Sequence, residues 1–164
     1  MPERWVLNAS PIISLARVDR ANLLFSIPDE VVVPQAVFDE VMAGPATDAA
    51  RVFLQSKESV IVTSESSSEI TPWDLGRGET AVLSFALASP NYVAILDDAA
   101  ARKCAKSFSI PVKGTLAVVL MAKQKNLIPS AADVLRSLRT AGFHLDDRII
   151  EKALKDVTGE SWSK

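Results

Sequence analysis

Two adjacent aspartates, Asp97 and Asp98, follow directly after the four apolar residues 93–96. Such a run is typical of a strand that is buried on both faces, and the alanine-rich segment after it predicts a helix. In parallel α/β sheets, ligands bind beyond the carboxyl ends of the strands. Both acids therefore fall where a site is expected. Alternatively, one of them caps the helix and Asp98 pairs with Arg102, four residues later.

Glu79 opens the predicted helix 77–89 and shares a face with the apolar residues Val82, Leu83 and Ala86. That face should pack on the sheet, and a carboxylate in line with it is costly to bury unless a charged group meets it. The alternative is that Glu79 sits in the first turn and only favours the helix dipole.

Glu40 lies in a second amphipathic segment, 34–43. Asp39 and Glu40 flank its apolar face about equally, so periodicity does not choose between them. A solvated helix flank is the alternative for either residue. The apolar face consists of Val37, Phe38, Val41 and Met42.

Carboxylates gathered at one edge of a sheet repel one another and need compensation. Mg²⁺ and Mn²⁺ prefer oxygen ligands, which makes either ion a natural partner for such a cluster. These ions also position and activate water against a phosphodiester and stabilise the leaving oxygen. The acids therefore predict a Mg²⁺ or Mn²⁺ site.

The elements that must position these residues alternate along the chain. Short runs rich in β-branched residues predict strands at 5–8, 31–34, 60–63, 93–96 and 110–114. Helical patterns occupy 10–19, 34–43, 45–56, 77–89, 98–108, 115–126, 130–141 and 146–157. More than 20 residues separate most successive strands, which implies βαβ crossovers. We predict a three-layer α/β/α sandwich, with an exposed loop at 64–76 and C-terminal helices within 129–157.

Composition fits one domain over residues 1–164, with 48% hydrophobic and 23% charged residues. The single cysteine, Cys104, excludes an internal disulfide and a thiolate metal cluster, and it lies on an apolar helix face. The N-terminus lacks a signal-peptide pattern, and no apolar run approaches the ~20 residues that cross a bilayer. We therefore expect a cytoplasmic protein without a membrane segment.

Residues 99–132 contain no acid but six cations, although the whole chain carries a net charge of −2. Cations beside an acidic pocket suit a phosphate backbone, although solvated helix faces explain them equally well. The residues 113–115 offer backbone N–H groups to a phosphate, unless Thr115 is an ordinary N-cap. The only histidine, His144, falls in a predicted surface turn, which disfavours a histidine-based triad. The six cations are Arg102, Lys103, Lys106, Lys113, Lys123 and Lys125.

The chain resembles PIN-domain proteins, particularly the small prokaryotic branch near the ribonuclease toxins of type II toxin–antitoxin modules. The combination of "GRGE", "LDDAAAR" and "VKGT" is the most specific part of the resemblance. The similarity covers roughly residues 5–155. The segments that carry it are 6–18, 31–41, 75–88, 94–128 and 135–154.

The resemblance implies a five-stranded, mainly parallel sheet between helices and an acidic pocket that binds Mg²⁺ or Mn²⁺. It also implies single-stranded RNA as the substrate, frequent homodimers and an antitoxin as partner. By position, the family's acids match Glu40, Glu79 and either Asp97 or Asp98, and its small hydroxyl residue matches Ser10. We expect these acids to be catalytic and the substrate to contact Ser10, Arg102, Lys103, Lys113 and Thr115.

Asn8 departs from the family pattern, which places an aspartate after the first strand. Asparagine still offers a carbonyl oxygen to a metal, but the lost charge should weaken metal binding. The alternative function is therefore a catalytically weak PIN-like module that binds RNA or a protein partner. A phosphoryl-aspartate protein is disfavoured because Asn8 occupies the position of a required acid, and a dinucleotide-binding fold lacks its glycine fingerprint.

Overall fold

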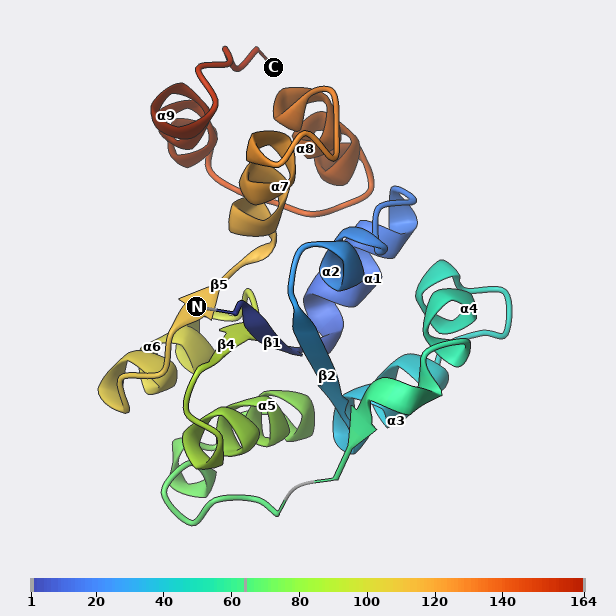
Figure 1. Ribbon diagram of the computed structural model, residues 1–164, viewed down its shortest axis with the longest axis vertical. Coiled ribbons are helices and arrows are strands. Elements are labelled where there is room, and N and C mark those ends of the chain that lie inside the picture. Colours follow the sequence, from blue (N-terminus) through green and yellow to red (C-terminus); the bar gives the residue numbers. More distant parts are fainter. Residues whose placement is uncertain (1, 64, 164) are drawn as a thin grey trace.

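The computed structural model describes residues 2–63 and 65–163, so Met1, Ser64 and Lys164 of the predicted domain and loop lie outside the described residues. Its centre is a five-stranded sheet in the order β3-β2-β1-β4-β5, in which every pair of neighbours is parallel (Figure 1). The five-stranded sheet expected from the sequence is thus confirmed. The strands are β1 (Arg4–Leu7), β2 (Glu30–Pro34), β3 (Ile61–Val62), β4 (Tyr92–Ile95) and β5 (Val112–Lys113).

Helices cover both faces of the sheet. Helices α5 and α6 lie on one face and α1, α2 and α7 on the other, which gives the predicted three layers (Figure 1). The helices are α1 (Ala9–Arg17), α2 (Leu23–Ser26), α3 (Gln35–Met42), α4 (Ala49–Gln55), α5 (Arg77–Ala88), α6 (Ala99–Ser107), α7 (Thr115–Gln124), α8 (Ala131–Thr140) and α9 (Asp147–Val157). Two 3₁₀ turns, η1 (Glu58–Val60) and η2 (Thr71–Trp73), complete the described elements.

Burial explains why the strand sequences do not alternate. All three residues Trp5, Val6 and Leu7 of β1 are fully buried, and so are Ala94 and Ile95 of β4. Strands covered by helices on both faces bury the side chains of both faces, so each position favours an apolar residue.

The register of the sheet brings the ends of β1 and β4 side by side. Leu7 pairs with Ile95, and the N–H of Asn8 donates to the carbonyl of Ile95 at 3.0 Å. Asn8 and Asp97 therefore leave the sheet at the same edge, although 89 positions separate them along the chain. This edge is the one at which parallel α/β folds bind ligands.

Some boundaries differ from those expected. The predicted helix 45–56 begins only at Ala49, because the Asp48 carboxylate accepts hydrogen bonds from the N–H groups of Ala50 and Arg51 and so caps α4. Helix α2 was not expected, since a single turn is too short to show a helical period.

The described part of the predicted loop 64–76 is exposed at most positions but has an anchor. Ile70 is fully buried, and the N–H of Ser67 donates to the hydroxyl of Ser84 on α5 at 2.9 Å. The rings of Trp73 and Phe108 form an edge-type contact, with 6.5 Å between centroids. Among the described residues, no helix has both the length and the apolar content to cross a membrane.

Candidate metal and active site

Asn8 follows directly after β1, at the edge of the sheet where the candidate site lies, and it is only 2% exposed. It occupies the N-cap position of α1, yet its side chain makes no capping hydrogen bond there. Instead, its amide nitrogen donates to Oε1 of Glu79 at 3.5 Å, at the long limit for a hydrogen bond. The Asn8 side chain is thus turned toward α5 rather than toward its own helix.

Gly78, the second residue of α5, is the point at which three elements meet. A methyl group at this position would lie 3.1 Å from Oδ1 of Asn8 and 3.2 Å from Oε1 of Glu40. The oxygens of two side chains, one after β1 and one on α3, therefore lie against the same backbone atom. Glycine leaves the space that these oxygens occupy.

Glu79 is close enough to Glu40 to affect the ionisation of the Glu40 carboxyl. Burial raises the pKa of the Glu40 carboxyl, and the negative charge of Glu79 raises that pKa further. Asp39 and Glu40 are both exposed, but Asp39 accepts a hydrogen bond from Gln35 on its own helix, whereas Oε1 of Glu40 lies at Gly78. The structure thus resolves the choice that periodicity left open: Glu40 faces the site.

Asp97 is held by three hydrogen bonds from two helices. Its Oδ1 accepts from the N–H of Thr115 at 2.7 Å, and its Oδ2 accepts from the hydroxyls of Thr115 at 2.7 Å and Ser10 at 3.1 Å. This carboxylate therefore fixes the end of β4 to the starts of α1 and α7. Both hydroxyls expected to contact substrate, those of Ser10 and Thr115, are directed at Asp97.

Asp98 has a different environment. It is exposed, and its carboxylate accepts from the N–H of Ala101 at 2.9 Å as the N-cap of α6. The cap anticipated from the sequence is confirmed, whereas the alternative ion pair between Asp98 and Arg102 is not formed within the described residues. The Thr115 N-cap expectation is wrong, because Gly114 occupies the cap and Thr115 is the first residue of α7.

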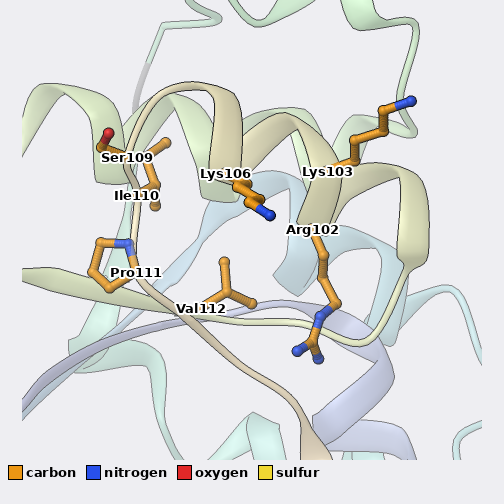
Figure 2. Close-up of a pocket in the computed structure, with 7 residues that line it drawn as sticks. All are labelled: Arg102, Lys103, Lys106, Ser109, Ile110, Pro111 and Val112. Carbon is orange, nitrogen blue, oxygen red and sulfur yellow. The ribbon is translucent and has the colours of Figure 1, made fainter.

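The predicted substrate-binding cations divide into two groups. Lys113 pairs with Glu3, with 3.0 Å between Nζ and Oε1. Arg102 and Lys103 line an open hollow of about 620 Å³ together with Lys106. Figure 2 shows Arg102 extending toward the side on which Val112 lies, whereas Lys103 points the other way.

The side-chain oxygens of Asn8 and Glu40 at Gly78, and of Glu79 beside Asn8, are of the kind that a hard divalent cation prefers. Glu40 and Glu79 supply carboxylate oxygens, and Asn8 supplies an amide oxygen. Burial and then the charge of Glu79 raise the Glu40 pKa, and a cation would offset that charge. Within residues 2–63 and 65–163, however, no three Asp, Glu, His or Cys side chains gather closely enough to hold a metal. The predicted acids are thus a pair, Glu40 and Glu79, with Asp97 held separately.

Two glycines that matter to the site were not singled out from the sequence. Gly78 lies in the motif "GRGE" and Gly114 lies in "VKGT". Only the fold shows which side chains approach these two glycines. His144 is exposed and Cys104 is fully buried, as expected. Burial raises the pKa of the Cys104 thiol, which keeps it an uncharged, inert group.

Comparison with known proteins gives one finding about the family. A family model described as a PIN domain matches residues 4–159, nearly the whole chain. No curated protein matches.

Proposed function

This chain belongs to the PIN-domain family, and on that premise we propose that it is a Mg²⁺- or Mn²⁺-dependent ribonuclease that cleaves single-stranded RNA. The observation that carries the proposal is the convergence of Asn8 and Glu40 on Gly78, with Glu79 beside them. The side-chain oxygens of Asn8 and Glu40 lie at Gly78, and Oε1 of Glu79 lies at the amide nitrogen of Asn8, so three separate elements contribute to one place. A hydrolytic metal site requires such an arrangement.

Each residue has a distinct role in this proposal. Glu40 and Glu79 hold the cation, and the amide oxygen of Asn8 completes their donor set. Asp97 faces the same edge of the sheet, in an orientation fixed by Thr115 and Ser10. A bound cation would supply alignment of water for attack on phosphorus and stabilisation of the leaving oxygen. Asp98 serves α6 as its cap rather than the metal.

The backbone of the RNA is bound by cations that form no ion pair within residues 2–63 and 65–163. Arg102, Lys103 and Lys106 project from one helix that begins directly after Asp98. Phosphate contacts of this kind fix the position of a nucleic acid without reading its sequence. Lys113 contributes less, since Glu3 already neutralises it.

The test is cleavage of an end-labelled single-stranded RNA in Mn²⁺ by the natural protein and by Glu40→Gln, Glu79→Gln and Glu69→Gln. The first two variants should lose about 100-fold or more in rate, because each removes a carboxylate that holds the cation. Glu69 is an exposed glutamate of the loop, so Glu69→Gln should match the natural protein. Equal cleavage by all four proteins would refute the assignment.

The alternative, a module that binds RNA or a protein partner without efficient cleavage, is favoured by one observation. The amide nitrogen of Asn8 donates to Glu79 and so partly satisfies a carboxylate that would otherwise await a cation. Under this alternative, Asn8→Asp should create metal affinity that the natural protein lacks. Titration calorimetry with Mn²⁺ measures this, and unchanged affinity would argue against the alternative.

The narrower expectations stay predictions. A toxin role, an antitoxin partner and a homodimer come from the resemblance, and a cytoplasmic location comes from the sequence pattern. If the protein is a toxin, its induced expression should arrest bacterial growth, and Glu79→Gln should relieve the arrest. Growth arrest that persists in the variant would separate toxicity from the proposed site.

A further inference from the structure

A second cavity adjoins the candidate site. It has a volume of about 570 Å³ and lies between the starts of α6 and α7 and the loop that joins α8 to α9. Its volume falls within the range of about 300–1,000 Å³ typical of small-ligand pockets. The residues that define its chemistry are Asp97, Arg102, Leu116, Leu120, Phe143 and Ile149.

The cavity has two chemically different ends. Aliphatic side chains of α7 and α9, together with the ring of Phe143, form an apolar body, whereas Asp97 and Arg102 supply charges. A methyl group at Gly114 would lie 2.7 Å from Nη1 of Arg102 and 2.9 Å from Oδ1 of Asp97. The two charged groups therefore reach the same end of the cavity because residue 114 has no side chain.

Arg102 is a cation with capacity to bind an anion. In the described part of the chain, no carboxylate lies within ion-pair distance of its guanidinium. It also lines the basic hollow of Figure 2, beside Lys103 and Lys106. Arg102 thus lines both the basic hollow and the second cavity.

The loop between α8 and α9 forms one wall of this cavity, and contacts made by Arg139 and Trp162 hold it in place. Arg139 pairs with Asp147 and donates from Nη2 to the carbonyl of Leu145 at 2.7 Å. Trp162 donates from Nε1 to Asp147 at 3.0 Å and stacks under the guanidinium of Arg139, 5.2 Å from its ring centroid. The wall that carries Phe143 and His144 is therefore preorganised.

We propose that this cavity binds the base of one unpaired nucleotide of the RNA and so determines which bond is cut. A nucleotide combines an apolar ring face with a phosphate for Arg102 and a ribose hydroxyl for Asp97. An apolar protein segment would leave the guanidinium without a partner in a partly desolvated place. The inference rests on the proposed function, since it assigns a specificity pocket to that same substrate.

The single histidine of the chain offers a direct readout, because His144 lines the cavity. Each of the four ribonucleoside 5′-monophosphates is titrated in the presence of EDTA, and the ring proton signals of His144 are followed by NMR. We expect saturable shifts whose dissociation constants differ among the bases. Ribose 5-phosphate is the control without a base and should bind more weakly.

Two variants of α9 separate the pocket from the general surface. Ile149 is 53% exposed and lines the cavity, whereas Val157 is 39% exposed and does not. Ile149→Trp should fill the mouth and weaken nucleotide binding about tenfold, the loss expected when one base no longer stacks. Val157→Trp should bind as the natural protein does.

The proposal is overturned if no nucleotide shifts His144, if ribose 5-phosphate binds equally well, or if Ile149→Trp changes nothing. The first result would assign the apolar body to another occupant, such as a protein helix. The binding assay requires neither metal nor turnover. Nucleotide binding without RNA cleavage would therefore refute the ribonuclease activity but support the nucleotide-binding cavity. RNA cleavage without nucleotide binding would support the activity and refute the role of the cavity.

Discussion

At the residue scale, Glu40 is the carboxyl of the candidate site whose ionisation the fold disfavours. Its pKa is raised first by burial and then by the charge of Glu79. Between the ordinary pKa of a glutamate and this raised value, the folded protein binds more protons than the unfolded chain. Stability therefore falls as the pH rises through that window. Without a cation, Glu40 should destabilise the fold at neutral pH.

Glu40→Gln removes this charge and should consequently stabilise the protein more at pH 7 than at pH 4. Urea unfolding at both pH values in EDTA measures the difference, with Glu69→Gln as the matched control on an exposed glutamate. Adding Mn²⁺ should stabilise the natural protein more than Glu40→Gln. A Glu40→Gln effect that is the same at both pH values would contradict the electrostatic origin.

At the scale of single residues, the sequence identified candidate site residues better than it identified their hydrogen-bond partners. Glu79 was singled out from its place on an amphipathic helix, whereas periodicity left Asp39 and Glu40 equal and only the family resemblance favoured Glu40. The different environments of Asp97 and Asp98 were not predictable, because they depend on hydrogen-bond donors located far along the chain. Ser10 precedes Asp97 by 87 positions and Thr115 follows it by 18. No local pattern contains that information.

At the scale of elements, Asp97 joins three segments into one unit. The end of β4 is tied through this carboxylate to the first residues of α1 and α7. Thr115, which supplies two of the three hydrogen bonds, is fully buried. A half-buried carboxylate held by a fully buried threonine in this way fixes the geometry of the sheet edge.

Thr115→Val keeps the shape of the side chain but removes the hydroxyl. It should lower the free energy of unfolding by about 1–3 kcal/mol, because Asp97 loses a donor in a buried place. Thr140→Val is the control: Thr140 is exposed, and its hydroxyl donates only within its own helix, so the change should stay within about 0.5 kcal/mol. Equal effects in urea titrations would show that the Asp97 contacts do not hold the edge.

The strands and most helices could be predicted because burial dictates their sequences. Residues 93–96 are apolar throughout, since helices cover both faces of β4. The start of α4 was placed too early, because the cap formed by Asp48 outweighs the helical pattern before it. The sequence also could not show that the acids form a pair rather than one compact cluster, since their separation depends on the packing of α3 and α5.

At the scale of the whole molecule, charge is distributed unevenly. The stretch 99–132 carries six cations and no acid in a chain of net charge −2. Glu3 neutralises Lys113, and Lys123 donates to the carbonyl of Pro129, so part of this charge serves the fold. The cations of α6 remain available beside the candidate site.

RNA binding should therefore depend on salt through α6. Lys106→Gln should reduce the slope of the logarithm of the binding constant against the logarithm of salt concentration by about 0.7, the value for one lost contact to a single strand. Lys152→Gln on α9 is the control, because Lys152 pairs with Asp156 at 3.0 Å. Fluorescence anisotropy in the Glu79→Gln background avoids cleavage. Equal slopes would exclude α6 from the RNA path.

The central claim is that Glu40, Glu79 and Asn8 form one metal site although they come from separate elements. Anomalous diffraction from a crystal soaked in Mn²⁺ tests it most directly. We expect a manganese peak in direct coordination of Glu40 and Glu79, and its loss in crystals of Glu79→Gln. A peak only at other acids, or a peak that Glu79→Gln leaves unchanged, would contradict the account.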